Sequence, residues 1–156
     1  MNLHMPQDEE SEAELKNLAA VPYQIISPAN NASIVGVFQD SLLGAYRFTR
    51  PDIKFDQREA MNLLMSFNKV DTSVLKKNKE ITSFDIMSQI MPPITMKFGN
   101  KWFEDSGEEF SKSNNVVEIV AGKYVRGQME KGVFGGGGKG LLQRVCNYYG
   151  NMASAD

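Results

Sequence analysis

Residues 34–50, IVGVFQDSLLGAYRFTR, hold the change of pattern on which our prediction of the fold rests. Residues 34–38 are apolar and mostly β-branched, which predicts a short buried strand. Asp40 follows where a side chain can cap a helix, and we expect that helix to cover residues 41–48. The sequence Arg-Pro-Asp at 50–52 predicts its end, because the residue before a proline avoids helical geometry.

Helices are also predicted on both sides of this segment. Residues 8–20 are acidic in the first turn, where negative charge favours the positive end of the helix dipole. Asp56 is expected to cap a helix at 57–67, with Glu59 as its partner in a capping box. The apolar stripe of this second helix comprises Ala60, Leu63, Leu64 and Phe67. It is the most regular helical pattern in the chain.

Short strands and helices alternate through the remainder, which predicts an α+β fold. Polar connections are expected at 68–82 and 101–115. The pattern starts and stops inside elements, so we expect a piece of a longer polypeptide. The other predicted elements are a helix at 84–91 opened by Thr82 or Ser83, a strand at 94–98, a hairpin at 116–120 and 123–129, a helix at 141–149 stopped by Gly150, and a helix starting at 151.

Composition limits the classes of function. Hydrophobic residues make up 42% and charged residues 23%, with a net charge of −2, so no global basic field points to nucleic acid. The sequence contains no apolar run long enough to span a membrane. His4 and Cys146 are the only residues of their types, so the chain cannot supply a zinc site or a disulfide framework.

A glycine-rich stretch, GVFGGGGKG at 132–140, invites a phosphate-binding interpretation. The nucleotide-binding loop requires G-x-x-x-x-G-K followed by Ser or Thr, because the hydroxyl holds magnesium. Here Gly140 follows Lys139, and Val133 stands where the first glycine belongs. A flexible connector is the better interpretation, although a self-contained enzyme that uses residues 135–139 for phosphate stays open as the weakest alternative. The sequence contains no G-x-S-x-G, H-E-x-x-H or C-x-x-C motif.

Two stretches together resemble the largest subunit of the multisubunit DNA-directed RNA polymerases. Residues 1–7, MNLHMPQ, are similar to the continuation that follows the catalytic aspartate loop of that family. The segment 34–50 matches a family signature through Gly36, Gln39, Asp40, Gly44 and Thr49. The resemblance covers nearly the whole chain and implies a pore domain at 1–150, with the start of the next (funnel) region at 151–156.

The resemblance also implies roles for particular residues. Asn2 and His4 would lie near the active centre, since they follow the family's metal loop. Lys131 and Lys139 would line the pore, where cations suit triphosphates and RNA. The family's second pore lysine is replaced by Gly132. The residues that match the family's structural motif are Gln39, Asp40 and Gly44.

The catalytic aspartates of the family are absent, so the resemblance implies no catalytic, metal-binding or cofactor-binding residue in this chain. Mg²⁺ would belong to the parent enzyme, because two-metal phosphoryl transfer needs carboxylates to hold it. Expected partners are the rest of the largest subunit, the other subunits, template DNA, RNA and nucleoside triphosphates, and no membrane. The expected location is the nucleus or cytoplasm, or a viral factory or virion for a viral enzyme. The alternative is a free-standing interaction or assembly module derived from this domain.

Overall fold

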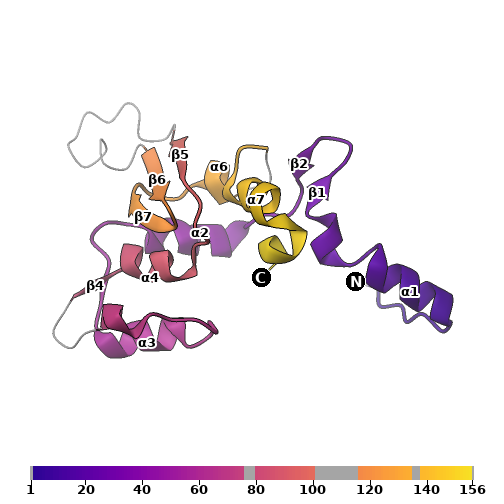
Figure 1. Ribbon diagram of the computed structural model, residues 1–156, viewed down its shortest axis with the longest axis horizontal. Helices are drawn as coiled ribbons and strands as arrows, with labels where there is room; N and C mark the ends of the chain where they lie inside the picture. The colour runs from indigo at the N-terminus through magenta and orange to yellow at the C-terminus, as the bar shows by residue number, and fades with distance from the viewer. Residues whose placement is uncertain (1, 76–79, 101–115, 135–137, 156) are drawn as a thin grey trace. The chain divides into compact units, whose positions relative to one another are not determined.

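The computed structural model describes residues 2–75, 80–100, 116–134 and 138–155, and divides the chain into two compact units (Figure 1). Residues 1–37 and 134–156 form the terminal unit, and residues 38–133 form the central unit. Each unit is described by itself below. The mixture of helices with small antiparallel sheets confirms the predicted α+β fold.

The terminal unit combines segments from both ends of the chain. Its strands β1 and β2 pair antiparallel, with Ile26 opposite Ser33. Its buried apolar side chains are Ile25, Leu141, Val145 and Cys146. Its elements are α1 (Glu9–Asn17), the 3₁₀ helix η1 (Val21–Gln24), β1 (Ile26–Ser27), β2 (Ala32–Ser33) and α7 (Leu141–Ala155).

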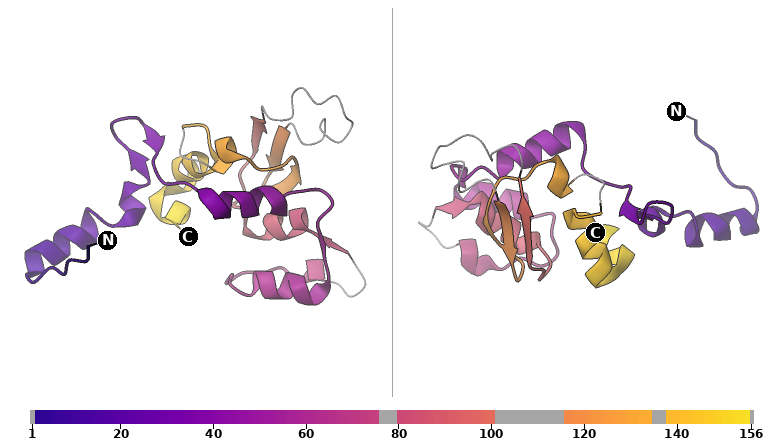
Figure 2. Two further views of the ribbon diagram at one scale, coloured as in Figure 1. Left: turned by 180° about the vertical axis from the view of Figure 1, so that it is seen from behind. Right: turned by 90° about the horizontal axis from the view of Figure 1, so that it is seen from above.

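The central unit is built around a three-stranded antiparallel sheet in the order β5-β6-β7, with a two-stranded sheet of β3 and β4 beside α3 and α4. Helix α4 packs against β7, as Figure 1 and the view from behind in Figure 2 show. The chain leaves the unit through α6 (Lys131–Phe134). The other elements are α2 (Gln39–Phe48), β3 (Lys54–Phe55), α3 (Gln57–Leu64), η2 (Thr72–Leu75), β4 (Ile81–Thr82), α4 (Ser83–Ile90), β5 (Met96–Gly99), β6 (Val116–Val120) and β7 (Lys123–Arg126).

The predicted hairpin is confirmed, although its second strand ends at Arg126 instead of residue 129. Strands β6 and β7 turn at Ala121 and Gly122, both of which have positive φ, as a tight hairpin connection requires. Val117 and Ile119 are fully buried on one face of β6, whereas Val120 is exposed on the other. The alternation of buried and exposed side chains on β6 therefore follows the predicted period of two.

Two of the predicted helix starts in the central unit are capping boxes. The Asp56 carboxylate accepts a 2.7 Å hydrogen bond from the Glu59 amide, and the Glu59 carboxylate accepts one from the Asp56 amide at 3.1 Å. Thr82 and Asp85 exchange the same pair of bonds at 3.2 and 3.1 Å at the start of α4. Each box satisfies amide groups that the first helical turn leaves unpaired.

The predicted strand at 34–38 is wrong. These residues form no strand, and Phe38 is 55% exposed, so the apolar run is not buried as expected. Asp40 does not cap α2 either. The helix begins one residue earlier than Asp40, with Phe38 in the cap position, and Asp40 lies in its first turn, where it still favours the helix dipole.

Helices α1 and α3 also end earlier than predicted. Helix α1 ends at Asn17 instead of residue 20, and its Leu15 is exposed. Helix α3 ends at Leu64 instead of residue 67. Gly150 does stop the first part of α7, since its φ of 85° and ψ of 176° break the helix, which then resumes as predicted. Parts of the predicted connections, residues 76–79 and 101–115, and residues 135–137 lie outside the described residues.

We expect Leu64→Ala to destabilise the central unit far more than Leu63→Ala. Leu64 is 2% exposed and packs in a cluster with Ala60, Ile81 and Ile86, whereas Leu63 is 43% exposed. Truncation of such a buried leucine to alanine lowers the free energy of unfolding by about 2–5 kcal/mol. Urea unfolding of the purified chain measures both variants. Equal loss in the two variants would contradict the assigned core.

Candidate functional site

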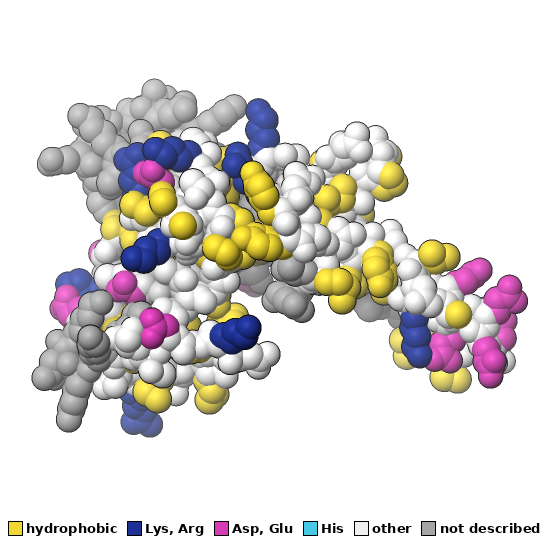
Figure 3. Space-filling model, in the orientation of Figure 1, with side chains coloured by type: hydrophobic (Ala, Val, Ile, Leu, Met, Phe, Trp, Pro, Cys, Tyr) yellow, Lys and Arg dark blue, Asp and Glu magenta, His cyan; other side chains and the backbone are white. Residues whose placement is uncertain are grey.

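The residues predicted to lie near an active centre or pore are divided between the two units. Asn2 and His4 are exposed in the irregular segment before α1, and Lys139 is exposed just before α7, so all three belong to the terminal unit. Lys131 is exposed at the start of α6, in the central unit. Figure 3 shows that acidic side chains gather over α1, the helix after His4.

The three residues of the predicted structural motif lie on α2. Gln39, Asp40 and Gly44 are all exposed. Gln39 has a φ of 50°, which is uncommon for a residue with a side chain. A Cβ at Gly44 would meet nothing within 4 Å, so this structure shows no close approach that requires glycine there.

The other end of α2 is held far more tightly, through Thr49. This side chain is fully buried. Its hydroxyl donates a 2.9 Å hydrogen bond to the Ala45 carbonyl and accepts one of 2.9 Å from the Met129 amide. Thr49 therefore ends the helix and joins it to a segment 80 residues away in sequence.

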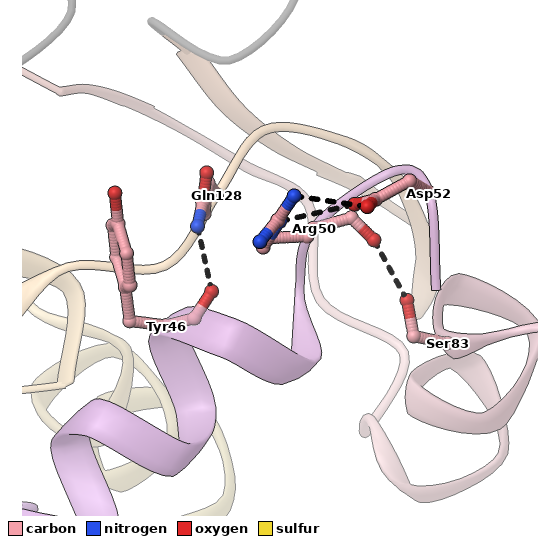
Figure 4. Close-up of polar contacts among 5 residues, drawn as sticks. All are labelled: Tyr46, Arg50, Asp52, Ser83 and Gln128. Carbon is pink, nitrogen blue, oxygen red and sulfur yellow. Dashed lines mark hydrogen bonds and ion pairs between the residues drawn. The ribbon is translucent and has the colours of Figure 1, made fainter. Parts of the chain in front are cut away.

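Gln128 adds a second and a third link beside Thr49. Its side-chain amide donates a 2.8 Å hydrogen bond to the Tyr46 carbonyl in the last turn of α2 (Figure 4). Its own carbonyl accepts a 3.1 Å hydrogen bond from the buried Asn100 side chain. The helix end is also connected to α4, where the Ser83 hydroxyl lies 3.5 Å from the Arg50 carbonyl and the Ser83 amide donates to the Ile53 carbonyl at 3.3 Å.

Gly127 fixes the turn by which β7 leads into this segment. Its φ is 96°, and a Cβ there would lie 2.2 Å from the Val116 carbonyl oxygen, so only glycine fits. The Tyr124 hydroxyl donates a 2.6 Å hydrogen bond to the Gly127 carbonyl. Burial raises the pKa of Tyr124, and the hydroxyl of Thr49 offsets part of that increase. The phenol stays protonated and keeps donating.

We call the residues that make these contacts the clamp: Tyr46, Thr49, Asn100, Tyr124 and residues 127–129. The chain leaves the clamp through Glu130 and reaches the exposed Lys131. Val133, two residues beyond Lys131, is fully buried, and its amide donates a 3.0 Å hydrogen bond to the Glu130 carbonyl. The arrangement presents a cation on a backbone that is fixed on both sides.

Comparison with known proteins places the clamp and Lys131 within a shared domain. A family model for RNA polymerase Rpb1, domain 3, matches residues 24–156. The chain belongs to this family. The human and bovine DNA-directed RNA polymerase III subunits RPC1 are each 29% identical to it over 174 residues. The alignment covers 100% of this chain and 12% of each relative. These matches confirm the predicted resemblance to polymerase largest subunits.

The structure gives a local reason for Gly132 in this Rpb1 domain 3. A Cβ at this position would lie 3.0 Å from the Phe98 ring and 3.1 Å from the Glu130 carboxylate oxygen. Such distances are shorter than ordinary van der Waals contacts, so a lysine would require the Phe98 ring to move. Lys131 directly precedes this position. Among residues 130–134, it is the cation that the structure leaves exposed.

Sequence reasoning missed most of the clamp. The sequence pointed to Thr49 only as part of the signature at 34–50, and Gln128, Asn100 and Tyr124 were not predicted from it. The Gly-Gln pair directly after β7 was the available signal, because glycine next to a strand end often marks a bulge or close approach. Among the described residues, no group of three or more His, Cys, Asp or Glu side chains could hold a metal ion, and no helix is long and apolar enough to span a bilayer.

A charged triad supports the strand that leads into the clamp. Glu118 lies directly opposite Lys97 on β5 and Arg126 on β7, with ion pairs of 2.7 and 3.0 Å. The Glu118 side chain is only 15% exposed. Hydrogen bonds from Lys97 and then from Arg126 hold the pKa of Glu118 below its ordinary value of 4.5.

We expect this triad to make stability depend on pH in the acid range. Because the folded pKa is lowered, the triad stabilises fully above about pH 4.5, and this contribution is lost as the pH falls through the folded pKa. Glu118→Gln should therefore flatten the dependence of urea midpoint on pH below 4.5. Glu80→Gln is the control, because the Lys54–Glu80 pair is largely exposed and contributes little. An unchanged profile in Glu118→Gln would contradict this role.

Proposed function

We propose that this chain forms part of the pore wall beneath the active centre of a DNA-directed RNA polymerase. Through such a pore, nucleoside triphosphates enter and the 3′ end of backtracked RNA leaves during transcription. Membership of the Rpb1 domain 3 family supports the assignment to a largest subunit. The chain spans 12% of the length of the RPC1 relatives, so the polymerase activity belongs to the larger assembly.

The observation that carries the pore role is the anchored cation at Lys131. Its side chain is exposed, while Met129 and Val133 on either side are fully buried. Triphosphates and RNA carry their charge on phosphate oxygens, and a cation confined in a channel wall raises their local concentration. Lys139 would supply a second cation from the terminal unit.

The outer surfaces of both units support an assembly-bound role. Many large apolar side chains are exposed, which is typical of surfaces that another protein part covers. We infer that the rest of the largest subunit and other polymerase subunits cover them. Examples are Leu43, Met61, Tyr148 and Met152 in α-helices, and Met65 directly after α3.

The catalytic magnesium of such an enzyme would be held outside this chain, because the family's three aspartates do not occur here. The role proposed for the chain itself is to shape the approach to the metal centre and to attract phosphates. Asn2 and His4, which are exposed before α1, would then lie close to that centre. Template DNA would be bound by other parts of the assembly.

The test is Lys131→Ala in the assembled polymerase that carries this chain. An exposed charge contact contributes up to about 1 kcal/mol, so we expect the KM for nucleoside triphosphates to rise by roughly fivefold at most. Cleavage of backtracked transcripts should change as well, because the RNA end uses the same pore. Lys139→Ala tests the second cation separately.

Lys123→Ala is the matched control, because Lys123 is also an exposed cation of the central unit, at the hairpin turn between β6 and β7. It should leave both measurements at wild-type values. A polymerase in which Lys131→Ala and Lys123→Ala behave alike would contradict the pore role. Failure of the chain to copurify with any polymerase subunit would instead favour a free-standing module.

A further inference from the structure

We propose that Thr49 and Gln128 are positioning residues for Lys131, and that they set where its ammonium group meets the phosphates of nucleotides and RNA. This inference rests on the proposed pore function. Neither side chain can contact a nucleotide or RNA in the pore directly, since both are buried. They would act through the backbone that carries the cation.

Three successive residues before the cation are held by side-chain hydrogen bonds. The Gly127 carbonyl accepts from Tyr124 at 2.6 Å, and the Gln128 carbonyl accepts from Asn100 at 3.1 Å. The Met129 amide donates to Thr49 at 2.9 Å. Residues 127–129 are not held by the backbone hydrogen bonds of a β-sheet, because β7 ends at Arg126. Side chains from distant parts of the sequence replace those bonds.

The position of Lys131 follows from these anchors. Consecutive Cα atoms lie about 3.8 Å apart, so Lys131 is within roughly 7.6 Å of the Met129 backbone. Two residues further on, Val133 is fully buried. The lysine backbone is thus held between two fixed points, and its freedom is confined to the side chain. A shift in the clamp would move the cation directly.

Thr49 is suited to this task because its hydroxyl makes bonds in both directions. It accepts from Met129 while it donates to Ala45, so the last turn of α2 and the segment 127–129 share one oxygen atom. Gln128 repeats the connection one residue earlier, through its 2.8 Å bond to Tyr46. Removal of the hydroxyl would leave the buried Met129 amide unpaired, and the segment would shift to satisfy it.

A purely structural role for the clamp predicts a different result. Loss of a buried hydrogen bond would then lower the amount of folded, assembled enzyme, but the KM of the molecules that assemble would not change. The effect would also be the same whether or not residue 131 carries a charge. A positioning role requires the lysine, so the two explanations separate in a double-mutant cycle.

The experiment uses the assembled polymerase with Thr49→Val and Thr49→Ser, each alone and combined with Lys131→Ala. We expect Thr49→Val to raise the KM for nucleoside triphosphates by about the same factor as Lys131→Ala, roughly two- to fivefold. Added to Lys131→Ala, it should cause no further rise. Thr49→Ser retains the hydroxyl and should restore the wild-type KM. Gln128→Leu is the second variant, in case Thr49→Val fails to assemble.

If Lys131→Ala raises the KM, then equal changes on adding Thr49→Val in both lysine backgrounds, or none in either, would overturn the proposal. If Lys131→Ala itself leaves the KM unchanged, the pore function fails, and the clamp is judged by a spin label on Lys131→Cys. Thr49→Val should then increase the mobility of that label relative to a label on Lys123→Cys. An unchanged spectrum at position 131 would refute positioning independently of any activity.

Discussion

The hydroxyl of Thr49 is the point on which the central unit depends. It lies between the last turn of α2 and the segment after β7, and its bonds to Ala45 and Met129 are each 2.9 Å long. An unpaired amide buried at Met129 would cost about 1–3 kcal/mol, a large fraction of the stability of a small domain. The side chain of Gln128 and the carbonyl of Tyr46 then fix how the two segments lie along each other.

The rest of the unit is arranged so that this contact can form. Gly127 allows the sharp turn out of β7, because any side chain there would collide with the Val116 carbonyl. The triad of Lys97, Glu118 and Arg126 secures the strands immediately before that turn. Electrostatics, backbone geometry and hydrogen bonding therefore act on one short segment, and that segment ends at an exposed lysine.

Local signals explain which parts of the fold could be predicted from sequence. The capping box of Asp56 and Glu59 and the alternating β6–β7 hairpin are set by neighbours within a few residues, so pattern alone finds them. The strand expected at 34–38 failed because its apolar side chains gain no partner strand, and burial decides strand formation. Asp40 failed as a cap because the helix starts before it.

In the candidate site, too, distant contacts could not be predicted from the sequence. Lys131 was predicted from a family resemblance, and the structure places it exposed on an anchored backbone. The clamp could not be predicted, because the bonds that join it to Tyr46 and Thr49 span about 80 positions in sequence and no local pattern encodes such a pairing. Family membership accounts for the shared domain, while the clamp gives a physical reason why one cation would keep a defined place in it.

Amide hydrogen exchange at Met129 tests the central claim most directly, in the wild-type chain and in Thr49→Val. The account predicts that the Met129 amide exchanges as slowly as the Ile119 amide of the central strand, and that Thr49→Val abolishes protection at Met129 while Ile119 keeps its own. Rapid exchange of Met129 in the wild-type chain, with Ile119 protected, would contradict it.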